Sequence, residues 1–79
     1  MTTQLEIARA AYVAAGLADH AAYIARVNAH AAYKDAVEAE YDIDEAHAAY
    51  KAAVEADTAA ATAYRKAQEA FHAAGGEGL

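Results

Sequence analysis

Residues 29–40 read AHAAYKDAVEAE and residues 46–57 read AHAAYKAAVEAD, so ten of the twelve positions are identical. The two copies are 17 residues apart, which is not a multiple of seven, and one continuous helix would therefore present them on different faces. If the chain instead folds back around residues 43 and 44, the copies run antiparallel and face each other. The repeat therefore favours a helical hairpin.

This fold-back predicts which side chains meet across the hairpin. The expected pairs are Tyr33 with Val54, Val37 with Tyr50, His47 with Glu40, His30 with Asp57, Tyr23 with Tyr64, and Phe71 with Gly16. Two of these pairs join a histidine to a carboxylate. We expect both to strengthen assembly when the histidine is protonated.

Composition also indicates helices. Alanine accounts for 28 of the 79 residues, and proline is absent, so most of the chain has high helix propensity. Thr3 with Glu6 has the spacing of a capping box, and Gly75-Gly76 is a typical helix stop. We expect an all-α, single helical domain over residues 1–79, with helices at about 4–41 and 44–74 and a flexible glycine-rich tail at 75–79.

Alanine recurs at alternating intervals of three and four residues along both expected helices. The first seam comprises Ala8, Ala11, Ala15, Ala18, Ala22, Ala25, Ala29, Ala32, Ala36 and Ala39, and the second comprises Ala46, Ala49, Ala53, Ala56, Ala60, Ala63, Ala67, Ala70 and Ala74. Such heptad seams predict coiled-coil-like pairing with a short distance between helices. The residues expected to pack inside the hairpin are Ala29, Ala32, Tyr33, Ala36, Tyr50, Val54, Tyr64 and Phe71.

Two alternatives to the hairpin stay open. A turn at Gly16-Leu17-Ala18-Asp19 would give a three-helix bundle, in which Leu17 makes the hydrophobic contact that follows a glycine stop. The second alternative is a single uninterrupted helical rod. It stays open because the expected turn near residues 41–45 contains no glycine to end the first helix. The first alanine seam continues through Gly16 without a change of phase, which favours one long first helix.

A second face is expected on the first helix. His20, Tyr23, Val27, His30, Lys34, Val37 and Tyr41 form a stripe nearly opposite the alanine seam. One neighbouring helix cannot cover both faces, so we expect two hairpins to assemble as a four-helix bundle dimer. The candidate interaction residues are Tyr12, Tyr23, Val27, His30, Val37 and Tyr41.

Charge and residue types exclude several functional classes. The net charge is −6, with 12 acidic against 6 basic side chains, so nucleic acid is not an expected partner. No apolar stretch is long enough to span a membrane, and we expect a cytoplasmic protein. Cysteine is absent, and the four histidines lack the spacing of metal ligands. We expect no catalytic, cofactor-binding or metal site.

Two functions fit this sequence. The first is a non-enzymatic structural or adaptor protein that acts through coiled-coil-like packing, with itself as a homodimer and with a larger protein as a second partner. The alternative is a small acidic inhibitor or decoy that binds a host protein, of the kind that phages encode. The alanine-rich, lysine-poor composition of the chain suits a phage or an actinobacterium with a GC-rich genome. Binding by an acidic decoy should weaken steeply with salt, whereas apolar helix packing should not.

Overall fold

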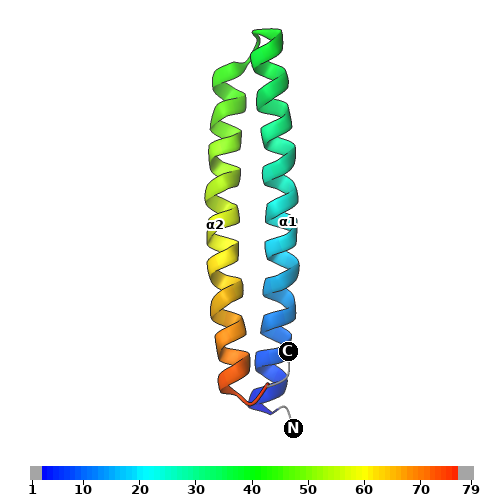
Figure 1. The fold of residues 1–79 in the computed structure, drawn as a ribbon, viewed down its shortest axis with the longest axis vertical. Coiled ribbons are helices and arrows are strands. Elements are labelled where there is room, and N and C mark those ends of the chain that lie inside the picture. Colours follow the sequence, from blue (N-terminus) through cyan, green and yellow to red (C-terminus); the bar gives the residue numbers. More distant parts are fainter. Residues whose placement is uncertain (1–2, 77–79) are drawn as a thin grey trace.

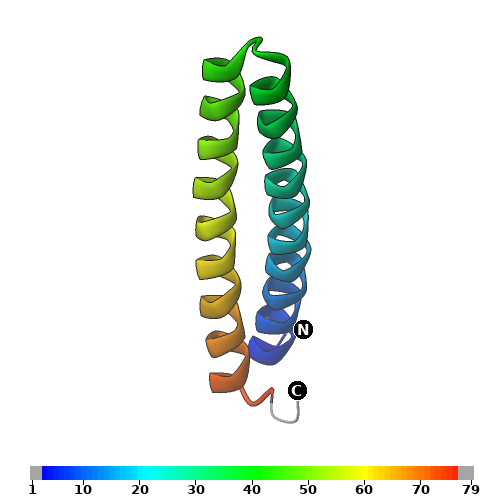
Figure 2. The same ribbon diagram turned by 45° about the horizontal axis from the view of Figure 1, so that its top comes forward.

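The computed structural model describes residues 3–76, which form two long helices packed side by side in antiparallel directions (Figures 1 and 2). Helix α1 spans Gln4–Ala39 and helix α2 spans Ile43–Ala73. The predicted helical hairpin is confirmed. The three-helix and single-rod alternatives are wrong, because Gly16 lies within the uninterrupted α1 and the chain reverses after residue 39.

The Thr3 half of the predicted capping box is present at the N-terminus of α1. Thr3 has extended backbone angles, and its Oγ1 accepts a hydrogen bond of 3.1 Å from the backbone N–H of Glu6. This bond satisfies one of the amide groups that have no carbonyl partner in the first turn of a helix.

The turn between the helices uses two non-glycine residues in the left-handed region, Glu40 at φ 54° and Asp42 at φ 56°. The N–H of Tyr41 donates to the Ala36 carbonyl at 3.2 Å, and the N–H of Glu40 donates to the Val37 carbonyl at 3.3 Å. These two bonds end α1 in the way that glycine usually does. The fold-back is therefore centred near residue 41, between the helix ends, and not at residues 43 and 44 as the sequence suggested.

The end of α2 is closed by a glycine pair. Gly75 adopts φ 102° and its N–H donates to the His72 carbonyl at 3.0 Å, while the Gly76 N–H donates to the Phe71 carbonyl at 2.9 Å. Gly76 is buried, and a Cβ atom there would lie 2.5 Å from the Phe71 ring. Gly76 is thus packed against Phe71, whereas Gly75 is exposed, and the flexible tail expected over residues 75–79 stays a prediction. The rest of that tail, residues 77–79, lies outside the described residues.

The hairpin interior combines one alanine position and one larger position per heptad on each helix. Half-buried or buried residues of this inner seam are Leu5, Ala8, Tyr12, Ala15, Asp19, Ala22, Arg26, Ala29, Tyr33 and Ala36 on α1, and Ala46, Tyr50, Ala53, Asp57, Ala60, Tyr64, Ala67 and Phe71 on α2, with Ala74 directly after α2. Val54 is half-buried beside it.

Only alternate alanines of the predicted seams point inward. Ala11, Ala18, Ala25, Ala32 and Ala39 on α1 and Ala49, Ala56, Ala63 and Ala70 on α2 are exposed, so the expected packing role of Ala32 is wrong. The physical reason is that a helix rotated toward its tyrosines buries more apolar area than one centred on two alanine positions.

Aromatic side chains cluster at both ends of the hairpin. At the end away from the turn, the Tyr12 ring stacks on Tyr64 at 5.2 Å and on Phe71 at 5.5 Å between ring centroids. Phe71 is only 5% exposed. Nearer the turn, Tyr33 stacks on Tyr50 at 6.0 Å and tilts against His47 at 5.2 Å.

Between these clusters the helices are joined by an ion pair. Arg26 Nε lies 2.7 Å from Asp57 Oδ2, and the Arg26 guanidinium also lies over the Tyr23 ring at 5.2 Å from its centroid. Both charged side chains are partly shielded from water.

The predicted cross-helix pairs are wrong by about one helical turn. Tyr33 meets Tyr50 and His47 instead of Val54, and Tyr64 meets Tyr12 instead of Tyr23. Likewise Phe71 meets Tyr12, Gly16 faces Tyr64, and Val37 is exposed.

Neither predicted histidine–carboxylate pair forms. Asp57 binds Arg26, His30 tilts against the Tyr50 ring, and His47 contacts Tyr33 while Glu40 lies in the turn. The shift follows from the position of the fold-back, since moving it toward residue 41 changes every facing residue.

Candidate interaction surface

Large apolar side chains are exposed mainly on α1. The exposed set is Ile7, Val13, Leu17, Tyr23, Ile24, Val27 and Val37 on α1, with Tyr41 in the turn and Ile43 at the start of α2. Leu17 has 68% of its surface in contact with solvent, although α2 packs along the same helix. The apolar side chains of α1 are therefore divided between two faces.

Part of this set forms a continuous stripe. We call this stripe, together with His20 and the alanines that flank it, the outer stripe of α1. It consists of Ala10, Val13, Leu17, His20, Ile24, Val27 and Ala31, all exposed. Their intervals alternate between three and four residues, so they lie on one side of the helix, roughly half a turn from the inner seam. At 1.5 Å per residue the outer stripe is about 33 Å long.

Helix α2 has no equivalent stripe. Its exposed side opposite the inner seam contains Lys51, Glu55, Thr58, Arg65, Glu69 and His72. Charged and hydroxyl groups of this kind are well solvated. The hairpin is thus polar on the outside of α2 and apolar on the outside of α1.

The structure places five of the six predicted interaction residues on exposed parts of α1 and the turn. Tyr23, Val27, Val37 and Tyr41 are 45–73% exposed, and His30 is exposed while its ring leans on Tyr50.

Tyr12 lies elsewhere, because its ring is stacked inside the hairpin on Tyr64 and Phe71. The Tyr12 and Tyr64 hydroxyl groups share a hydrogen bond of 3.2 Å. This bond, with partial loss of solvent and the nearby Tyr64 charge at high pH, raises the pKa of Tyr12 above its usual 10.0.

Sequence reasoning missed Val13, Leu17 and Ile24 as members of the surface. Their spacing of four and seven residues was a usable signal, and it extends the stripe that contains Val27.

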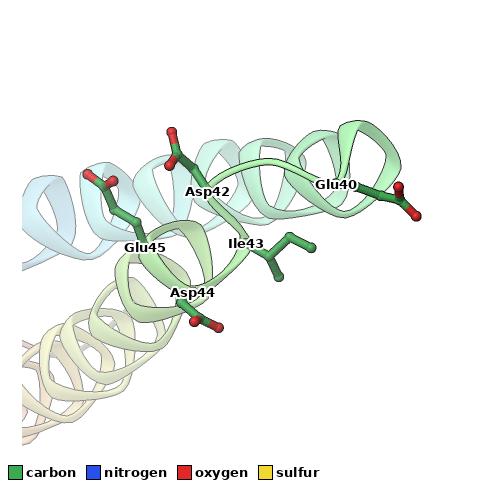
Figure 3. Close-up of a pocket in the computed structure, with 5 residues that line it drawn as sticks. All are labelled: Glu40, Asp42, Ile43, Asp44 and Glu45. Atoms are coloured by element: carbon green, nitrogen blue, oxygen red, sulfur yellow. The ribbon is translucent and has the colours of Figure 1, made fainter.

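The turn is the most acidic part of the molecule. A shallow hollow there is lined by Glu40, Asp42, Ile43, Asp44 and Glu45. Their carboxylates point in different directions instead of converging on one point (Figure 3). Within residues 3–76, no group of three or more histidine or carboxylate side chains is arranged to hold a metal ion. Asp44 and Glu45 lie in the first turn of α2, where negative charge interacts favourably with the helix dipole.

Neither α1 nor α2 is sufficiently long and apolar to span a membrane. Comparison of the chain with protein-family models, with curated proteins and with solved structures finds no match.

Proposed function

We propose that this chain is a non-enzymatic structural or adaptor protein that self-associates through the outer stripe of α1, forming a dimer of hairpins. The observation that carries the proposal is the contrast between the apolar outside of α1 and the polar outside of α2. Contiguous exposed apolar surface is typical of protein interfaces. Each Å² of apolar surface removed from water contributes about 25 cal/mol.

The inner seam of α1 is not available to a second hairpin, because α2 already packs against it. A second hairpin placed against the outer stripe would give an assembly of four helices in a row, because the outer stripe lies roughly half a turn from the inner seam. In this row the two α1 helices are central and α2 stays at each solvent edge, so the helices are arranged differently from the four-helix bundle that the sequence suggested. A larger partner with an apolar helix could occupy the same stripe and would then compete with self-association.

Light scattering coupled to size-exclusion chromatography, over a range of protein concentrations, tests this proposal. We expect the unaltered chain to be a dimer and the Leu17→Glu variant to be a monomer, because each dimer would bury two unpaired carboxylates. Thr58→Glu places the same new charge on the outside of α2 and should leave the dimer intact. Circular dichroism should show equal helicity for all three. A monomeric unaltered chain, or equal loss of dimer in both variants, would contradict the proposal.

The acidic turn supports a second candidate, an inhibitor or decoy that presents carboxylates to a basic site on another protein. Glu40, Asp42, Asp44 and Glu45 are all exposed there, and within residues 3–76 the only ion pair is the distant one between Arg26 and Asp57. A complex formed by this tip should weaken steeply between low and physiological salt. A complex formed by the outer stripe should change little, so a salt titration separates the two.

A further inference from the structure

We infer that the partner of α1 is α1 of a second copy, packed antiparallel about a twofold axis beside His20. This inference rests on the proposed function and specifies its geometry. It derives from the residues along the exposed side of α1. Side chains at equal distances before and after residue 20 are similar in size or opposite in charge.

The first row of the exposed side contains residues spaced by seven, namely Glu6, Val13, His20, Val27 and Lys34. All five are exposed. An antiparallel second copy centred on residue 20 places Val13 opposite the partner's Val27 and His20 opposite the partner's His20. The same centre places Glu6 opposite the partner's Lys34, which joins opposite charges.

The second row contains Ala10, Leu17, Ile24 and Ala31, also spaced by seven and also exposed. Reversal about the midpoint between residues 20 and 21 places Leu17 opposite the partner's Ile24 and Ala10 opposite the partner's Ala31. The two rows therefore share one centre within half a residue. Large side chains lie beside the axis, small ones lie beyond them, and complementary charges lie at the ends.

A parallel arrangement lacks this complementarity. It would place Glu6 next to the partner's Glu6 and Lys34 next to the partner's Lys34, and like charges across an interface are unfavourable. Within residues 3–76, neither Glu6 nor Lys34 belongs to the ion pair of the hairpin, which joins Arg26 and Asp57. A twofold contact is also closed, so assembly stops at two copies instead of growing into a filament.

Cross-linking between introduced cysteines tests the orientation. The chain contains no cysteine, so each variant has a single reactive thiol. Cysteine at position 20 would face its own counterpart across the twofold axis, at the usual helix separation of about 8–10 Å. Cysteine at position 13 would lie about 21 Å along the helix from its counterpart. The reagent is a bismaleimide with a linker too short to span the longer distance.

We expect His20→Cys to cross-link with itself and Val13→Cys alone to give little product. A mixture of Val13→Cys with an affinity-tagged Val27→Cys should give the mixed product, because these positions face each other. Light scattering on each variant before reaction shows whether it is dimeric.

Two failures are distinguishable. If the variants are dimeric and Val13→Cys cross-links with itself as efficiently as His20→Cys does, the antiparallel arrangement is overturned and self-association is not. A chain that is monomeric at every concentration would overturn the proposed function and this arrangement together.

Discussion

Replacing Glu40 with glycine should stabilise the hairpin. Glu40 has φ 54°, and the left-handed region costs an L-residue about 1–2 kcal/mol because Cβ approaches a backbone oxygen. Glycine has no Cβ and avoids this cost, but it increases the entropy of the unfolded chain, which offsets about 0.4–1 kcal/mol. The net expectation for Glu40→Gly is about 0.5–1 kcal/mol of added stability. In a domain of this size, that gain corresponds to a rise in Tm of about 2–8 °C.

Two control variants separate backbone strain from other effects. Glu40→Gln removes the same charge from the acidic turn but keeps the strained backbone, so it measures the electrostatic part alone. Glu38→Gly makes the same substitution in the last turn of α1, at a residue without positive φ, where glycine relieves no strain and should cost up to about 1 kcal/mol. Thermal unfolding followed by circular dichroism, at one fixed protein concentration, compares the three variants with the unaltered chain. Backbone strain at Glu40 would be contradicted by a Glu40→Gly variant no more stable than Glu40→Gln, or by a loss of stability in both glycine variants.

Two further predictions concern the hairpin interior. Ala60→Leu should destabilise the hairpin by about 1–3 kcal/mol in chemical denaturation, because Ala60 lies in the inner seam, whereas Ala63→Leu on the exposed side of α2 should change stability by less than about 0.5 kcal/mol. Similar losses in both would show that the helices are not closely packed at alanine. The raised pKa of Tyr12 means that its protonated form contributes stability below pH 10.0, and that this contribution is lost as pH rises through the folded pKa. When the pH is raised from neutral to above 10, the Tm of Tyr12→Phe should therefore fall less than the Tm of the unaltered chain. An equal fall in both would argue against the shared hydrogen bond.

The helices themselves could be predicted from the sequence, because alanine content, the Thr3 cap and the glycine stop are local features. The register could not, because it depends on where the chain reverses. Glu40 and Asp42 both adopt positive φ. Aspartate is tolerated in this region, but glutamate rarely adopts it, so the residue types do not show that α1 ends at Ala39. A difference of two or three residues in the centre of the fold-back was enough to exchange every predicted partner.

The candidate surface was predictable in part for a related reason. Val27 and Tyr23 lie on the stripe that the sequence assigned to a second contact, whereas Tyr12 appeared equally suitable by residue type and packs inside. An aromatic residue at heptad spacing fits an inner or an outer face equally well. Only the position of α2 determines which face is covered.

The two sides of α1 are unequal near its middle. Between Gly16 and Ala29 the inner seam contains Asp19, Ala22 and Arg26, while the aromatic clusters hold the two ends of the hairpin. The outer stripe has its largest side chains, Leu17 and Ile24, over this same segment. Residues 16–29 of α1 are therefore held by less apolar contact than the segments around Tyr12 and Tyr33, and their amide hydrogens should exchange faster than those of these two segments. Any molecule bound to the outer stripe would slow that exchange, which couples the local stability of α1 to occupancy of its outer face.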